Sequence, residues 1–169
     1  MPVLVLEKEW RILFSVLFLL VVFSIDTLRL QNKSFRKIFL NFFGGILKKH
    51  EYREYTGSTY LAISYALINL LFEKEIIIFS LLILSICDPV ASIIGNYVKP
   101  NIKIFKKSLN GLIGFYIAGI LVSIITFPNL SLSVKLLAVL LSGIVEIFTP
   151  IDDNLAIPIA SSFILKFSL

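Results

Sequence analysis

The sequence predicts an all-α integral membrane protein with about six transmembrane helices, and three observations carry this prediction. Of the 169 residues, 57% are hydrophobic and only 16% are charged, whereas a soluble domain is nearly half apolar and about a quarter charged. The mean hydropathy is +0.93. The apolar residues form long runs, and a membrane-spanning helix needs about 20 of them. Too few polar side chains remain to cover a water-soluble globule, and the same composition excludes a disordered chain.

Six apolar runs are expected to form the spans, with short polar segments between them. Their ranges are 10–28, 57–72, 76–98, 108–127, 134–148 and 154–167. The first run is expected to be a retained helix rather than a signal peptide, because Glu7 and Glu9 stand where a signal peptide has basic residues. The amphipathic run 35–47 is expected to lie along the membrane surface. No repeat or linker divides residues 1–169, so we expect one domain.

The third run contains Asp88-Pro89, and a broken helix is expected there. Proline lacks a backbone N–H and disfavours helix at the residue before it, so a new half-helix would begin at Asp88. At the cytoplasmic end of the first span, Asp26 is expected to pair with Arg29, three residues further on.

Lysine and arginine gather in two of the polar segments. The loops after the first and third spans hold eleven of the 16 basic residues, and the positive-inside rule places both loops in the cytoplasm. The N-terminus is then outside, and the break before the sixth span faces the cytoplasm. The net charge of +5 indicates anionic partners such as lipid headgroups or a nucleotide. No nucleic-acid partner is expected, because no soluble part remains to enter a groove.

Acidic side chains inside apolar runs indicate functional sites, because each costs about 2.5–3.5 kcal/mol on insertion scales. Asp88 opens the expected half-helix, and Gly95 follows on it. A half-helix N-terminus suits an anionic ligand, but a carboxylate there would repel phosphate unless a divalent cation lay between them. Asp88 is therefore a candidate Mg²⁺ ligand. The alternative is that Asp88 only caps a kinked helix.

Two further groups lie near the same membrane face. Lys106, Lys107 and Ser108 open the fourth span, with Gly111 in its first turn, and these residues suit a polyphosphate; the alternative is a simple topology signal. Glu146 and the segment Asp152-Asp153-Asn154 place three carboxylates within eight residues, which fits metal–phosphate chemistry; the alternative is a capped loop with solvated acids.

Together these pieces resemble the CTP-dependent lipid-alcohol kinases: dolichol kinase, phytol kinase and the fungal-type CTP-dependent diacylglycerol kinase. The matching residues are Arg36-Lys37, His50-Glu51, Thr56-Gly57-Ser58-Thr59, Asp88-Pro89-Val90-Ala91 with Gly95, Lys106-Lys107-Ser108 with Gly111, Glu146, Asp153-Asn154 and Pro158. The chain departs from the family at Leu40 and Asn41, where a histidine is frequent, and at Asn110, where a glutamate is frequent.

The resemblance implies transfer of the γ-phosphate of CTP to the hydroxyl of a membrane lipid alcohol, with Mg²⁺. An isoprenoid alcohol such as a polyprenol, geranylgeraniol or phytol is the expected acceptor. Asp88 is expected to hold the metal with Asp153 or Glu146, and Asp153 to accept the hydroxyl proton. The residues expected to bind the nucleotide or its phosphates are Lys106, Lys107, Ser108, Gly95, Gly111, Asn154, Arg36 and Lys37. Arg36 and Lys37 are also candidates for contact with membrane-lipid headgroups.

Three alternatives stay open from the sequence. A CTP-dependent diacylglycerol kinase differs only in its acceptor. A CTP:phosphatidate cytidylyltransferase would release pyrophosphate instead of CDP. A small ion-coupled transporter would also have acids in broken helices. Six short spans with a lateral entrance for a lipid are compatible with a homodimer.

Overall fold

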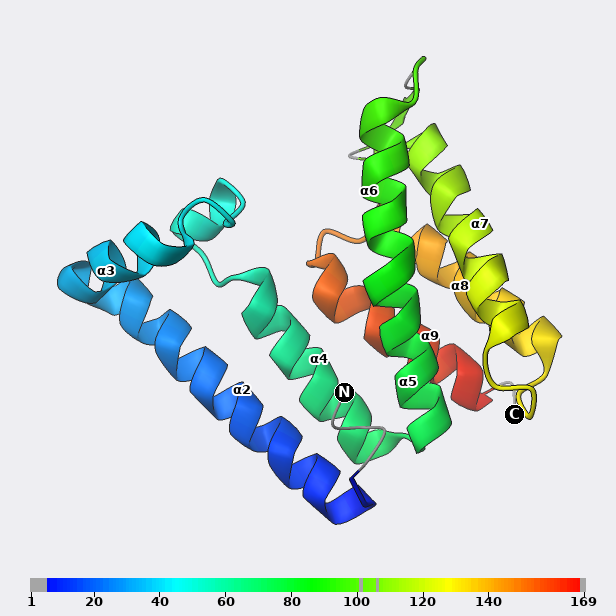
Figure 1. Ribbon diagram of the computed structural model, residues 1–169, viewed down its shortest axis with the longest axis horizontal. Coiled ribbons are helices and arrows are strands. Elements are labelled where there is room, and N and C mark those ends of the chain that lie inside the picture. The colour runs from blue at the N-terminus through cyan, green and yellow to red at the C-terminus, as the bar shows by residue number, and fades with distance from the viewer. Residues whose placement is uncertain (1–5, 101, 106, 168–169) are drawn as a thin grey trace.

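The computed structural model describes residues 6–100, 102–105 and 107–167, and these are predominantly helical (Figure 1). The elements in chain order are α2 (Lys8–Gln31), α3 (Lys33–Phe43), a 3₁₀ turn η1 (His50–Tyr52), α4 (Gly57–Leu71), α5 (Lys74–Leu82), a π-helical turn η2 (Ile83–Cys87), α6 (Asp88–Tyr97), β1 (Lys103–Ile104), β2 (Lys107–Ser108), α7 (Leu109–Ile125), α8 (Leu132–Phe148) and α9 (Asp153–Phe167). Each expected apolar run therefore lies on a helix.

The prediction of six spans is not confirmed. Two helices in the described ranges are long and apolar enough to cross a membrane, Lys8–Gln31 and Lys74–Tyr97, and two shorter apolar helices are Gly57–Leu71 and Leu109–Ile125. Helix α4 has 15 residues, α8 has 17 and α9 has 15. At about 1.5 Å per residue these helices are roughly 23–26 Å long, shorter than a hydrocarbon core of about 30 Å.

The broken helix expected at Asp88-Pro89 is not confirmed either. Segments α5, η2 and α6 follow one another without a gap, and Cys87 and Asp88 both keep helical backbone angles. The irregularity is the π-helical turn directly before Asp88. Proline removes one hydrogen bond and crowds the preceding turn, and a π turn is a known way to accommodate such a residue within a helix. Pro89 thus widens the helix instead of ending it.

Helix α2 has the burial pattern of a membrane helix. The residues that it buries are all polar or charged: Arg11, Ser15, Asp26 and Arg29. Its large apolar side chains point outward, and Leu20 and Val21 are 56% and 57% exposed. A soluble protein does not leave such a large apolar surface uncovered, so this surface suits contact with lipid.

The helices form two arms joined by α9 (Figure 1). Helix α2 packs on α4, α6 packs on α7, α7 packs on α8, and α9 contacts α4, α5 and α8. The buried apolar core is centred on α5 and η2, where Ile76, Ile77, Phe79 and Ile83 are at most 1% exposed. Between α6 and α7 the chain forms a small antiparallel hairpin, β1–β2, in the segment expected to be a loop.

Candidate functional site

Lys107 lies between three carboxylates that come from three different helices. Its Nζ is 2.7 Å from Asp153 Oδ2, 2.9 Å from Glu146 Oε1 and 3.9 Å from Asp88 Oδ1. The two shorter contacts are hydrogen bonds that the ammonium donates. Glu146 is 5% exposed, and its second oxygen, Oε2, is buried without a partner. The structure thus brings the candidate residues of three separate sequence segments into one cluster.

Local structure explains how each side chain reaches the cluster. Asp88 begins α6 directly after the π turn, and Asp153 begins α9. Glu146 lies near the carboxyl end of α8. Lys107 pairs with Ile104 in the hairpin, where Phe105 at the turn has a positive φ of 53°. The hairpin therefore directs Lys107 back toward the helix ends.

The charge of Lys107 is stabilised by its neighbours. Burial alone would lower the pKa of this lysine, but hydrogen bonds and opposite charges from Asp153 and Glu146 outweigh burial and raise the pKa above its usual value. The ammonium is therefore held in its charged form throughout the physiological pH range.

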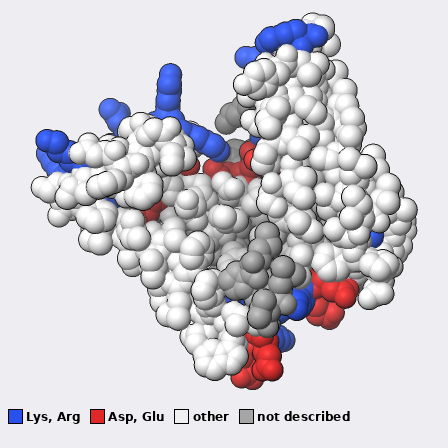
Figure 2. Space-filling model, in the orientation of Figure 1, with Lys and Arg blue, Asp and Glu red and all other residues white. Residues whose placement is uncertain are grey.

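A polar cavity of about 420 Å³ surrounds this cluster. Its lining residues are Lys48, Asp88, Ala91, Ser92, Gly95, Asn96, Lys103, Lys107, Ser108, Gly111, Leu112, Glu146, Ile147 and Asp153. Figure 2 shows acidic surface in a hollow between the arm that carries α3 and the arm that carries α6 and α7. A volume of this size is within the range of small-molecule sites, about 300–1,000 Å³.

Two glycines bring α6 and α7 together at one wall of the polar cavity. A Cβ at Gly95 would lie 2.4 Å from Ser108 Oγ, and a Cβ at Gly111 would lie 2.8 Å from the carbonyl oxygen of Ala91. Ser108 Oγ also accepts a hydrogen bond of 3.0 Å from Gly111 N and so caps α7. The glycines therefore permit the helix crossing that holds Ser108 in the wall.

An apolar groove of about 530 Å³ lies next to the polar cavity. It runs from α2 across α4 to η2, and its lining residues are Phe14, Phe18, Leu61, Tyr65, Leu81, Leu84, Ser85, Asp88, Pro89 and Asn154. Asp88 lines both the groove and the polar cavity. One carboxylate therefore stands where an apolar channel meets a charged pocket.

The other candidate residues lie elsewhere. Arg36 donates to the carbonyl oxygen of Tyr52, and neither Arg36 nor Lys37 is among the described residues that line the polar cavity. Asn154 lines the apolar groove and donates to Asp152 Oδ1 at 2.8 Å. Lys106 lies outside the described residues.

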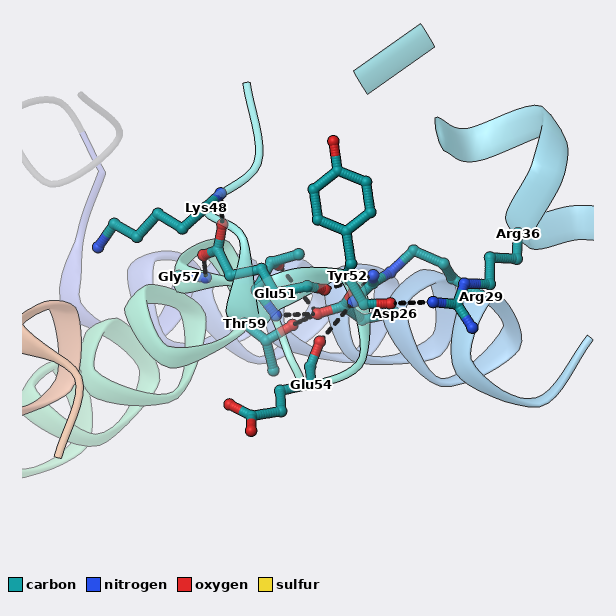
Figure 3. A network of polar contacts seen from close by, with 10 residues as sticks. Asp26, Arg29, Arg36, Lys48, Glu51, Tyr52, Glu54, Gly57 and Thr59 are labelled. Carbon is teal, nitrogen blue, oxygen red and sulfur yellow. Dashed lines mark hydrogen bonds and ion pairs between the residues drawn. The ribbon is translucent and has the colours of Figure 1, made fainter. Parts of the chain in front are cut away.

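The expected pairing of Asp26 with Arg29 is confirmed. Arg29 Nη2 is 2.7 Å from Asp26 Oδ1, and both side chains are at most 3% exposed. Arg29 also donates to the carbonyl oxygens of Glu51 and Glu54, both at 2.7 Å, while Asp26 Oδ2 accepts from Thr56 and Thr59 (Figure 3). This buried network ties the segment before α4 to α2.

The carboxylates fit a magnesium ion only with help from a substrate. No group of three or more His, Cys, Asp or Glu in the described part of the chain is arranged to hold a metal by itself. Mg²⁺, however, takes one or two carboxylates together with substrate phosphates and water. The unpartnered Glu146 Oε2 and the neighbouring Asp153 are hard oxygen donors of this kind.

Sequence analysis missed several lining residues. Lys48 and Lys103 counted there only as topology signals, and Asn96 had no assigned role, yet all three line the polar cavity. The spacing of Ser92, Gly95 and Asn96 on one helical face with Asp88 was the available signal for α6. No local signal connects Lys48 with a site formed 40 or more residues later in the sequence.

Three known proteins are similar to this chain. An uncharacterised protein of Rickettsia prowazekii is 28% identical over 150 residues, which are 83% of this chain and 73% of that protein. CTP-dependent diacylglycerol kinase 1 of Schizosaccharomyces pombe is 27% identical over 161 residues, 85% of this chain and 74% of the kinase. An uncharacterised protein of Methanocaldococcus jannaschii is 31% identical over 128 residues, 73% of this chain and 64% of that protein.

No family model and no solved structure matches the chain. The similarity to the fission-yeast kinase is distant, but it extends over most of both chains. It supports, independently of the individual motifs, the resemblance of this chain to the CTP-dependent lipid kinases.

Proposed function

We propose that this protein is a membrane-embedded kinase that transfers the γ-phosphate of CTP to the hydroxyl of a lipid alcohol. The observation that carries the proposal is the position of Asp88, which lines both the polar cavity and the apolar groove. A lipid in the groove would present its hydroxyl at Asp88, and a nucleotide in the polar cavity would present its phosphates to the same point.

The reaction needs few parts, because phosphoryl transfer depends mainly on positioning and charge neutralisation. The lipid hydroxyl oxygen attacks the γ-phosphorus, the bond between this phosphorus and the bridging oxygen breaks, and CDP leaves with the electrons of that bond. We assign the hydroxyl proton to the carboxylate of Asp88. Sequence analysis favoured Asp153, but Asp153 is hydrogen-bonded to Lys107 at 2.7 Å, whereas Asp88 is 3.9 Å from it and faces the groove.

Magnesium fits the remaining carboxylates. Asp153 and Glu146 would hold the ion, and when bound it would neutralise charge on the phosphates. Lys107 fixes both carboxylates in the cavity wall through its two hydrogen bonds.

The apolar lining of the groove suits the tail of a lipid acceptor. The isoprenoid alcohol expected from the sequence needs only an apolar channel for its chain. The groove would accept other lipid chains as well, so this acceptor stays a prediction. Diacylglycerol is the second candidate, and the similarity to CTP-dependent diacylglycerol kinase 1 of Schizosaccharomyces pombe favours it. We place the reaction at the cytoplasmic face, where the basic loops are expected to lie.

The test uses purified protein in detergent with CTP labelled either at the γ- or at the α-phosphate. Geranylgeraniol, phytol, a polyprenol and diacylglycerol serve as acceptors. We expect label from the γ-phosphate in the lipid and CDP as the second product. Label from the α-phosphate in the lipid would instead indicate a cytidylyltransferase and would contradict the proposal.

A matched pair of variants tests the role of Asp88. Asp88→Asn should lower kcat about 10²–10⁴-fold, the usual contribution of a general base. Glu54→Gln is the control, because its carboxylate is exposed and only its backbone carbonyl is used in the structure. Equal activity of both variants would remove Asp88 from the reaction.

A further inference from the structure

The lysines of the polar cavity are not equivalent. Lys107 donates to Glu146 and Asp153, so its charge is already balanced by carboxylates. Lys48 and Lys103 line the same cavity, and within the described ranges neither ammonium forms a hydrogen bond or an ion pair. A phosphate that enters the cavity therefore meets two ammonium groups that donate to no carboxylate among the described residues, and neither belongs to Lys107.

We propose that Lys48 binds the triphosphate of the nucleotide and that Glu51 positions Lys48 for this contact, an inference that rests on the proposed function. Lys48 belongs to the segment between α3 and α4, whereas most of the cavity comes from α6, α7, α8 and α9. It lies close enough to Asp88 for the two charges to interact. Lys48 is thus the lining residue that comes from the α2–α4 part of the chain, whereas the other lining residues lie on α6 or later elements.

Glu51 fixes the backbone on both sides of itself. Its carboxylate is buried, with the residue 5% exposed; Oε2 accepts from Lys48 N at 2.7 Å and Oε1 accepts from Gly57 N at 2.6 Å. A single side chain therefore connects the backbone of Lys48 to the first residue of α4. Figure 3 shows the Lys48 side chain extending away from this carboxylate, so its ammonium is free to reach the cavity.

The segment that carries Glu51 is itself held in place. Arg29 donates to the carbonyl oxygens of Glu51 and Glu54, and Asp26 accepts from the backbone and side chain of Thr56. These contacts are buried, except that Arg29 to Glu54 is partly buried, and hydrogen bonds of charged groups are strongest where they are buried. The position of Lys48 is thus determined by helix α2 through a continuous set of hydrogen bonds.

Lys48→Met tests the phosphate contact, and Lys49→Met is its matched control. Both lysines are exposed neighbours, but only Lys48 lines the cavity. Binding of labelled CTP to the purified protein is measured by equilibrium dialysis, and the KM values for CTP and lipid are measured separately. We expect Lys48→Met to weaken CTP binding about tenfold or more and to leave the KM for lipid unchanged. Lys49→Met should bind CTP like the wild type, and Lys48→Arg should restore most of the binding.

A double-mutant cycle tests the positioning role of Glu51. Glu51→Gln keeps the shape of the side chain but loses one of the two backbone hydrogen bonds, so CTP binding should weaken. If Glu51 acts through Lys48, the variant with both Glu51→Gln and Lys48→Met should bind CTP no more weakly than Lys48→Met alone. Additive losses would show that Glu51 has only a structural role and would overturn that part of the proposal.

The outcomes separate this inference from the proposed function. Unchanged CTP binding by Lys48→Met would overturn the inference and leave the kinase proposal intact. A wild-type protein that binds CTP through Lys48 but phosphorylates no lipid alcohol would overturn the kinase proposal alone. A wild-type protein that binds no CTP would overturn both.

Discussion

Replacing Lys107 with methionine tests the charge cluster directly. The substitution removes the ammonium but keeps the side-chain length, and it leaves Glu146, which is 5% exposed, beside Asp153 without an opposite charge. Removing one partner of a buried ion pair costs about 3–5 kcal/mol, whereas exposed pairs contribute about 0–1 kcal/mol. Lys107 is 31% exposed and Asp153 21% exposed, so we expect an intermediate loss of about 2 kcal/mol.

Thermal unfolding of the purified protein in detergent measures this loss. For a chain of this size about 1 kcal/mol lowers the Tm by about 2–4 °C, so Lys107→Met should lower it by about 4–8 °C. Lys103→Met is the control, because Lys103 lines the same cavity without an ion pair among the described residues. Adding Glu146→Gln to Lys107→Met should recover part of the loss, since the amide removes the unbalanced charge. A Tm for Lys107→Met equal to that of Lys103→Met would refute the reasoning.

Three further predictions concern stability. The pKa of Lys107 is raised in the folded protein above its ordinary value of 10.5. The contribution of Lys107 to stability is therefore complete below pH 10.5 and is lost as the pH rises through the higher pKa of the folded state. The Tm difference between wild type and Lys107→Met should be constant from neutral pH to about pH 10 and shrink above it. Gly95→Ala should destabilise the protein by about 1–3 kcal/mol, because the new Cβ would lie 2.4 Å from Ser108 Oγ. Gly45→Ala is the control and should cost far less, because a Cβ at Gly45 meets nothing within 4 Å. Equal unfolding temperatures of the two variants would contradict the helix crossing. Arg29→Lys should lower the Tm nearly as much as Arg29→Met. An ammonium cannot replace the guanidinium that contacts Asp26, Glu51 and Glu54 together. A Tm of Arg29→Lys equal to that of the wild type would argue against this network.

The positions of the helices could be predicted from the sequence, since hydropathy follows the chain locally. The run expected at 108–127 is the helix Leu109–Ile125, and the run at 134–148 is the helix Leu132–Phe148. The effect of Pro89 could not be predicted in the same way. Local rules favour a break there, but Ile83 and Cys87 are fully buried on the preceding turn, and tertiary packing keeps the segment helical.

The candidate site was predictable in part for a similar reason. An acid in an apolar run has a high cost wherever it lies, so Asp88 and Glu146 were detectable without a structure. Lys48 was not, because its proposed role depends on the hydrogen bonds that Glu51 forms with Lys48, Gly57 and a buried arginine on α2. Arg36, a candidate for the nucleotide or for lipid headgroups, donates to the backbone of Tyr52 and is not among the described residues that line the polar cavity, so its role stays a prediction.

The burial pattern of α2 connects the two cavities physically. Lipid is as apolar as leucine, so apolar packing alone holds membrane helices together weakly; α2 instead buries only polar residues against its neighbours, among them Asp26 and Arg29. Its apolar side chains are therefore exposed or half-buried, and Phe14 and Phe18 line the groove. The same helix therefore supplies one wall of the apolar groove and, through the network at its other end, the position of Lys48. A change in the tilt of α2 would displace the wall of the apolar groove and Lys48 together; under the proposed function, this gives a physical reason for lipid and nucleotide to be aligned at Asp88 at the same time.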